Sequence, residues 1–177
     1  HRDPAAARSM VDLAFAEIER LEAILSRHRA GTAVDRLNRT GIVRDAPDEL
    51  VTVLREATRV SELTGGAFDP TVAPVLHLYE TRAKASGGLP EPGEIEEALA
   101  LVDYRAIAID HGTVRLERPG MALTLDGIAK GFIVDRAAAG LMGAGAEHVM
   151  VEAGGDVASS SVPGESFEGW QLAVQDP

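Results

Sequence analysis

Residues 125–131, Leu-Asp-Gly-Ile-Ala-Lys-Gly, form the segment of this chain that is best suited to binding an anion. An apolar stretch precedes them and a helical pattern over 127–142 follows, which leaves backbone amides free at a helix N-terminus. Asp126 can cap this helix, Gly127 lets a ligand approach its first turn, and Lys130 adds a positive charge. These features predict a phosphate pocket, and the alternative is an ordinary capped helix with a surface lysine.

Residues 64–71, Thr-Gly-Gly-Ala-Phe-Asp-Pro-Thr, form a second candidate in a turn-rich loop. Two consecutive glycines free the backbone, and Pro70 holds Asp69 in an extended conformation. An exposed Phe68 beside the Asp69 carboxylate could stack on a heteroaromatic ring while the carboxylate accepts a hydrogen bond from it. The alternative is a helix C-cap whose Phe68 packs into the core.

Residues 151–156, Val-Glu-Ala-Gly-Gly-Asp, form the third candidate. A strand that ends in Gly-Gly-Asp can bring its backbone against a ligand, although a tight turn between two strands uses the same residues. The familiar phosphate-loop, dinucleotide, zinc-protease and serine-hydrolase motifs are absent from the sequence. The five histidines are scattered, with no pair at the spacing of metal ligands.

The composition is that of a globular domain. The 177 residues include 45% apolar and 25% charged residues, which suits one domain with its own core. Cysteine is absent, which excludes disulfides, thiolate metal sites and a cysteine nucleophile. No apolar run approaches the roughly 18 residues that a membrane-spanning helix needs.

The net charge of −11 arises entirely after residue 60. Residues 1–60 hold ten arginines and ten acids, whereas residues 61–177 hold seven bases and eighteen acids. This balance argues against a nucleic-acid partner, which needs a broad basic face, and is typical of a solvated acidic surface. An anionic ligand would therefore need backbone amides, an isolated base or a metal ion.

Hydrophobic periodicity predicts an α+β fold, with helices first and then strands around one helix. The expected helices are 5–26, 47–63, 72–83, 94–102 and 127–142. The expected strands are 104–109, 113–117, 121–125, 147–152 and 170–174, with a hairpin turn at 110–112. We expect 26–41 and 158–168 to be loops, the first with at most one short turn, and 86–93 to be a linker.

Taken in order, the three candidate segments resemble the ApbE family of flavin transferases, and the resemblance covers most of the chain. The matching stretches are Leu-Ser-Arg-His at 25–28, residues 32–38 ending in Arg-Leu-Asn, the Gly-Gly-Ala-Phe-Asp-Pro-Thr-Val loop, Leu-Asp-Gly-Ile-Ala-Lys-Gly-Phe with Val134-Asp135 after it, Gly-Gly-Asp, and Trp170 running to Asp176-Pro177. The resemblance implies an ApbE-like α+β fold with helices packed on a mixed or antiparallel sheet.

The resemblance also implies a reaction. Family members bind FAD and Mg²⁺, cleave the diphosphate, transfer FMN to a Thr or Ser hydroxyl of a partner flavoprotein, and release AMP. Because the attacking hydroxyl belongs to the partner, no internal nucleophile is required, and we assign no catalytic residue in this chain. The alternatives are a flavin-binding or maturation protein without transferase activity, an inactive fragment, and a structural domain without a small-molecule site.

Site residues follow from the resemblance position by position. Ala67, Phe68 and Asp69 match the loop that contacts adenosine in the family. Lys130 matches a contact to the flavin nucleotide, and Gly127 matches the position whose backbone carbonyl helps to hold the metal.

Three positions depart from the family pattern. His28 stands where an aromatic gate residue is common, and Thr124 stands where many members carry a ligand-binding Asp. Here the Asp comes two residues later, at Asp126, where it either replaces that ligand or caps the helix.

The family domain continues beyond Pro177 with an Asp and a Thr that complete the metal site, and it begins with a strand before residue 1. We therefore expect residues 1–177 to be a single but incomplete domain, truncated at the C-terminus, with an impaired metal site and weak FAD binding. Members act outside the cytoplasm, in the periplasm for example, often as lipid-anchored proteins. The resemblance implies that location here, with a membrane anchor that this chain lacks.

Overall fold

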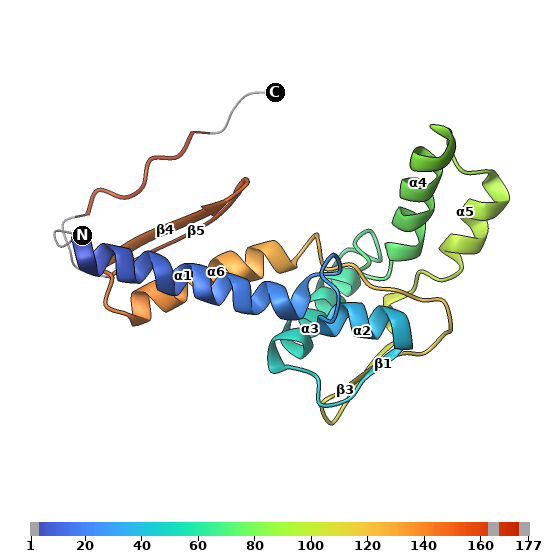
Figure 1. The fold of residues 1–177 in the computed structure, drawn as a ribbon, viewed down its shortest axis with the longest axis horizontal. Helices are drawn as coiled ribbons and strands as arrows, with labels where there is room; N and C mark the ends of the chain where they lie inside the picture. Colours follow the sequence, from blue (N-terminus) through green and yellow to red (C-terminus); the bar gives the residue numbers. More distant parts are fainter. Residues whose placement is uncertain (1–3, 163–166, 174–177) are drawn as a thin grey trace. The chain divides into compact units, whose positions relative to one another are not determined.

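The computed structural model of the chain describes residues 4–162 and 167–173. The described chain forms two compact units, one made of residues 1–20 and 130–177 and the other of residues 21–129, and each is described by itself. Helix α1 (Pro4–Leu25) contributes residues to both units. The chain combines helices with antiparallel sheets (Figure 1), which confirms the expected α+β class. That the whole chain is one incomplete domain stays a prediction.

Four helices lie within residues 21–129. They are α2 (Ala33–Thr40), α3 (Asp48–Leu63), α4 (Ala73–Ser86) and α5 (Pro92–Leu99). Helix α3 buries the stripe that its periodicity predicts, through Leu50, Val53, Leu54 and Ala57. Helices α4 and α5 pack against each other and are joined by a short connection (Figure 1).

The prediction of a loop over 26–41 is wrong, because 33–40 is helix α2. Thr32 caps it by accepting a hydrogen bond from the Asp35 amide, and Gly41 ends it with a φ of 73°. Only Ala33, Val34 and Leu37 are buried along it, so its apolar pattern is too short to stand out from the polar residues between them.

A three-stranded antiparallel sheet completes this unit, in the order β1 (Ile42–Val43), β3 (Thr113–Leu116) and β2 (Ile107–Asp110). The hairpin turn between β2 and β3 is confirmed. His111 and Gly112 both have positive φ, 42° and 75°, as a tight two-residue hairpin requires. The strand predicted from 104 begins instead as a short 3-10 helix, η1 (Tyr104–Ala106), and the two-residue β1 was not predicted.

The prediction of a strand over 121–125 is also wrong. The segment is extended, but its central residue pairs with a side chain instead of a strand. The Leu123 amide donates to Oδ1 of Asn38 at 2.6 Å, and Nδ2 of Asn38 donates to the Leu123 carbonyl at 2.9 Å. The side-chain amide thus takes the place of a neighbouring strand, while Met121, Leu123 and Leu125 are buried as the alternation predicts.

The other unit holds α6 (Ala129–Gly143) and a hairpin of β4 (His148–Ala153) and β5 (Asp156–Ser161). Its core contains Val134, Ala138, Val149 and Ala158. Residues 126–128 form a turn before α6, the serine-rich stretch up to Ser161 is a strand and not a loop, and 170–173 form no strand. Asp176 and Pro177, the last residues of the expected motif, lie outside the described residues.

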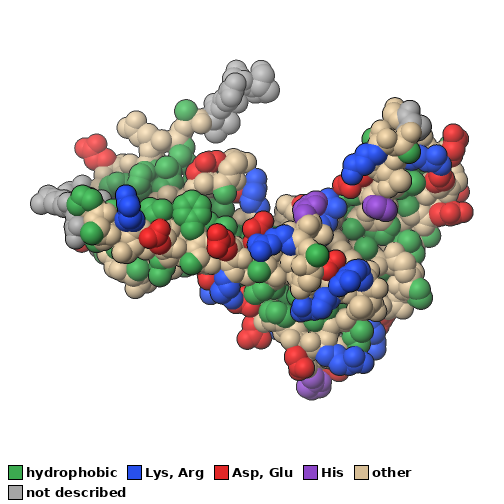
Figure 2. All heavy atoms as spheres, viewed as in Figure 1, with side chains coloured by type: hydrophobic (Ala, Val, Ile, Leu, Met, Phe, Trp, Pro, Cys, Tyr) green, Lys and Arg blue, Asp and Glu red, His purple; other side chains and the backbone are tan. Residues whose placement is uncertain are grey.

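The surface mixes charges of both signs. On the face shown in Figure 2, Lys and Arg side chains lie between Asp and Glu side chains, and hydrophobic side chains are exposed among them. Val11 and Phe15 on α1 are among the large hydrophobic side chains that are exposed to solvent. Within 4–162 and 167–173, none of the helices combines the length and the hydropathy of a membrane span.

Candidate functional site

Phe68 and Gly127, which belong to two of the three candidate segments, lie in contact within residues 21–129. After α3, Gly65 and Gly66 turn the chain with φ of 60° and 86°, and the Phe68 amide donates to Oγ1 of Thr64 at 3.1 Å. A Cβ placed on Gly127 would lie 3.2 Å from Cε2 of Phe68, so a larger residue here would require the ring to move by a few tenths of an ångström. Phe68 is half-buried, which is intermediate between the exposed stacking ring and the core residue of the two alternatives.

Both carboxylate oxygens of Asp69 accept hydrogen bonds from within the protein. Its Oδ1 accepts hydrogen bonds from the amide and the hydroxyl of Thr71, and its Oδ2 accepts one from the Tyr104 amide at 3.0 Å. The buried hydroxyl of Thr71 accepts in turn from the Asp103 amide at 2.7 Å. Asp69 therefore ties its loop to the start of η1, while Ala67 beside it is exposed.

Asp126 lies in a cluster of charged groups. The Nε of Arg27 donates to its Oδ2 at 2.8 Å, and Nε2 of His28 lies 3.5 Å from the same oxygen. The Asp126 amide donates to Oγ1 of Thr124, a buried residue whose own amide donates to the Pro70 carbonyl at 2.8 Å. The carboxylate thus faces Arg27 and is not used to cap a helix. The amides of the turn after it bond instead to the Leu125 carbonyl.

The environment of Asp126 favours its ionised form. Burial raises its pKa, but the hydrogen bond from Arg27 and the charge of that guanidinium lower the pKa by more, with smaller contributions from Thr124 and His28. The pKa of Asp126 therefore lies below its ordinary value. Burial lowers the pKa of Arg27, and its hydrogen bonds and ion pairs with Asp126 and Glu80 raise it above the ordinary value on balance.

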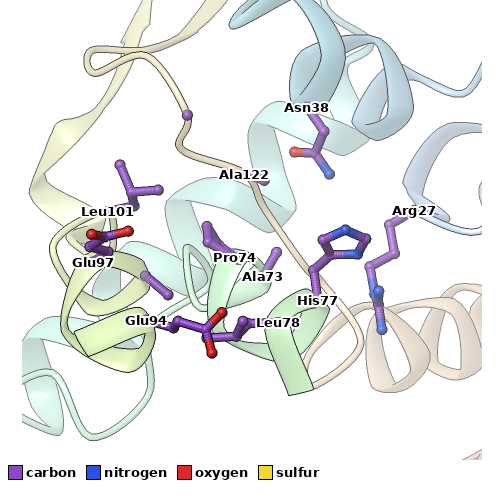
Figure 3. A pocket seen from close by; sticks show the side chains of 12 residues that line it. Arg27, Asn38, Ala73, Pro74, His77, Leu78, Glu94, Glu97, Leu101 and Ala122 are labelled. Carbon is purple, nitrogen blue, oxygen red and sulfur yellow. The ribbon is translucent and has the colours of Figure 1, made fainter. Parts of the chain in front are cut away.

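A cavity of about 530 Å³ lies beside this cluster, between α4, α5 and the extended segment near Ala122 (Figure 3). Leu78, Leu101 and Pro74 contribute apolar surface, and Arg27 and His77 contribute polar groups. Its volume lies in the range of small-molecule sites, and the carboxylates of Glu94 and Glu97 also line it. None of the eight residues predicted from the sequence lines it, and Arg27 is the residue that connects it to Asp126.

Lys130 and the Gly-Gly-Asp turn, predicted as parts of separate motifs, meet in the other unit. The Nζ of Lys130 donates to the Gly154 carbonyl at 3.0 Å and lies 3.0 Å from Oδ2 of Asp156. Gly154 and Gly155 both have positive φ, and the Gly155 amide donates to Oε1 of Glu152 at 2.7 Å. The residues form a tight turn, and the charge of Lys130 is already balanced by Asp156.

The described residues do not fit a resident divalent cation. Among residues 4–162 and 167–173, no group of three or more His, Asp or Glu side chains is arranged to hold a metal ion. Asp126, the carboxylate nearest to Gly127 in sequence, is paired with a guanidinium, which repels a cation.

Sequence reasoning missed Arg27, Glu80 and Asn38. Arg27 occurs in the Leu-Ser-Arg-His stretch, but nothing in that stretch indicates a role for it. Its partners Glu80 and Asp126 lie 53 and 99 residues away along the chain. No local pattern signals such pairings. The ligand-binding roles expected for His28, Ala67, Phe68, Asp69, Thr124, Asp126, Gly127 and Lys130 stay predictions.

Comparison with known proteins places this arrangement in a family. The chain is 32% identical over 179 residues to the FAD:protein FMN transferase of Haemophilus influenzae, with 90% of this chain and 50% of that protein covered. It is 27% identical to the FAD:protein FMN transferase of Treponema pallidum, with 99% and 53% covered. A solved structure of a mutant of the flavin transferase ApbE from Vibrio cholerae is similar at a TM-score of 0.85 and 26% identity, over 97% of this chain and 59% of that chain.

The chain spans about half the length of the curated relatives that it matches. The model of the ApbE family matches residues 4–177, which is nearly the whole chain. This chain belongs to the ApbE family.

Proposed function

We propose that this chain is the FAD-binding part of an enzyme that transfers FMN from FAD to a partner protein. One observation carries the proposal: the Phe68 loop and the Asp126–Gly127 turn, far apart in the sequence, are in contact, and Arg27 connects Asp126 to a cavity of about 530 Å³. The names of the relatives support the choice of FAD and FMN within the family. The exposed side of the Phe68 ring is suited to stacking on a heteroaromatic ring.

The proposed reaction is phosphoryl transfer. A Thr or Ser hydroxyl oxygen of the partner attacks the phosphorus of the FMN half of FAD, the bond to the bridging oxygen breaks, and AMP leaves while the hydroxyl proton is released. The Arg27 guanidinium and the Lys130 ammonium group each face a carboxylate, that of Asp126 and that of Asp156 respectively. A diphosphate at Lys130 would therefore have to share the ammonium group with Asp156.

The Mg²⁺ requirement of the family is part of the proposal, with the backbone carbonyl of Gly127 as one expected ligand and an Asp and a Thr outside the described residues as the others. The proposal also includes action outside the cytoplasm, for example in the periplasm, on a flavoprotein acceptor, and attachment to a membrane by a lipid anchor. These parts follow from the family resemblance.

The test uses this chain and a version extended to the length of its relatives. FAD fluorescence titration of the 177-residue chain measures binding, and incubation of the extended version with FAD, Mg²⁺ and an acceptor flavoprotein domain measures transfer. We expect a covalently yellow acceptor and one AMP for each FMN attached. An extended version that leaves the acceptor colourless under these conditions contradicts the proposal.

A flavin-binding protein without transferase activity is the second candidate. The pairing of Lys130 with Asp156 favours it, because the charge of that ammonium group is already balanced within the protein. It predicts that the extended version binds FAD tightly and releases no AMP.

A further inference from the structure

Arg27 connects three segments that are far apart along the chain. It follows the C-terminal end of α1, and its guanidinium bonds to Asp126 through Nε at 2.8 Å and to Glu80 on α4 through Nη2 at 3.3 Å. The Arg27 side chain is only 18% exposed, whereas the side chains of Asp126 and Glu80 are 48% and 45% exposed. The least exposed member of these three is thus the base, which binds an acid on each of two segments.

We propose that Arg27 is a positioning residue, which holds the Asp126–Gly127 turn against Phe68 and forms the adjacent wall of the cavity between α4 and α5. The proposal rests on the proposed function, because the ligand that this turn would serve is the flavin nucleotide.

The geometry of a guanidinium suits this role. Its planar fork presents separate N–H groups in fixed directions, so one side chain can bind two carboxylates on different segments at once. A lysine at this position has a single charged nitrogen on a flexible stem, so it cannot hold Asp126 and Glu80 in the same fixed relation. A positioning role at residue 27 therefore requires Arg, whereas a role that needs only positive charge would be filled equally well by Lys.

Other contacts keep the turn folded without Arg27. The Asp126 amide donates to Oγ1 of Thr124, and the Thr124 amide donates to the Pro70 carbonyl. Leu123 is held by Asn38. Because the backbone has these anchors, the loss of Arg27 should change the orientation of the carboxylate and the fit of Gly127 against Phe68 more than it changes the fold.

The first experiment compares amide and aromatic NMR spectra of the 177-residue chain with Arg27→Ala, Arg27→Lys and the control Arg29→Ala. Arg29 lies two residues away and pairs only with the exposed Glu22 in the described structure. We expect both Arg27 variants to shift the signals of Asp126, Gly127 and Phe68, and the control to leave them in place. Signals that stay in place in both Arg27 variants overturn the proposal.

The Asp126→Asn variant keeps the test decisive if the Arg27→Ala variant does not fold. It removes the charge that Arg27 binds and keeps the size of the side chain. We expect it to shift the Gly127 signal in the same direction as Arg27→Lys, and we expect the double variant to shift it no further. Shifts that add in full show that Arg27 and Asp126 act independently, which overturns the proposal.

The second experiment measures FAD affinity and melting temperature of the same variants. We expect Arg27→Lys to weaken FAD binding about tenfold, as loss of an orienting partner behind a ligand-binding group does, while the melting temperature largely recovers relative to Arg27→Ala. Affinity that simply follows melting temperature across the series shows a purely structural role and overturns the proposal. A wild-type chain that does not bind FAD contradicts the proposed function instead, and the NMR comparison still decides whether Arg27 positions the turn.

Discussion

Replacement of Gly127 by Ala tests the close contact between the motif turn and the Phe68 ring. The new methyl carbon would lie 3.2 Å from Cε2 of Phe68, closer than ordinary van der Waals contact, so the ring must move by a few tenths of an ångström. Tight packing of an exposed residue against a half-buried ring costs about 1 kcal/mol, the low end of the range for overpacked cores. Gly→Ala also reduces the freedom of the unfolded chain, which stabilises the fold by roughly 0.4–1 kcal/mol. The two effects nearly cancel, so we expect a change in unfolding free energy between zero and about 0.6 kcal/mol of destabilisation.

Gly93→Ala is the matched control. Gly93 lies in the same unit, in α5, its φ is not in the left-handed region, and a Cβ there meets nothing within 4 Å. We expect this variant to stabilise the protein by about 0.5–1 kcal/mol, because only the backbone effect and the helix propensity of alanine act. Urea unfolding followed by circular dichroism gives both values.

The contact predicts a specific rescue. Phe68→Leu in the Gly127→Ala background shortens the side chain and removes the crowding, so the double variant should lose less stability than the sum of the two single variants. If Gly127→Ala stabilises the protein as much as Gly93→Ala does, the ring does not press on Gly127 and the reasoning is refuted.

Three further predictions follow from the same contacts. Asp69→Asn leaves one oxygen to accept the three bonds that Asp69 now accepts, and we expect a loss of about 1–2 kcal/mol in urea unfolding, which a neutral result would contradict. Lys130→Met breaks an ion pair between half-exposed groups, and we expect a loss below about 1 kcal/mol, measured in the same way. Because the pKa of Asp126 is lower in the folded chain than in the unfolded chain, its contribution to stability is present above the unfolded pKa and is lost as pH falls through the folded pKa. Asp126→Asn should flatten this part of the curve of stability against pH. An unchanged curve would show that Asp126 does not contribute to the pH dependence.

The elements that sequence reasoning predicted well are those whose own pattern is long enough to carry the signal. Helix α3 has sixteen residues and a complete buried stripe, and it was predicted nearly to the residue. Helix α2 has eight residues and depends on Thr32 and Gly41 at its two ends, so its periodicity alone was too weak. Strand β5 is rich in serine, which suggested a loop, but it pairs along its whole length with β4.

The same limit applies to the candidate site. The contact of Phe68 with Gly127 and that of Lys130 with Asp156 each join two motifs that the sequence singled out, so the motifs were informative about which residues meet. The motifs did not indicate which other side chains pair with these residues. Whether Lys130 is free or paired, and whether Asp126 caps a helix or binds Arg27, depends on residues that only the tertiary fold brings close.

The pairing of Asn38 with Leu123 has a consequence for motion. A strand in a sheet opens only with its ladder, whereas the segment around Leu123 is held by the Asn38 side chain from α2 and by the bond from the Thr124 amide to the Pro70 carbonyl. Such a segment has its own opening free energy, lower than that of the sheet β1–β3–β2 beside it. In native-state hydrogen exchange the Leu123 amide should therefore exchange through a local opening that also exposes the Asp126–Gly127 turn, while the β3 amides wait for a larger unfolding. The segment that leads into the proposed site can then open and close for a ligand on a timescale of its own, with the sheet intact.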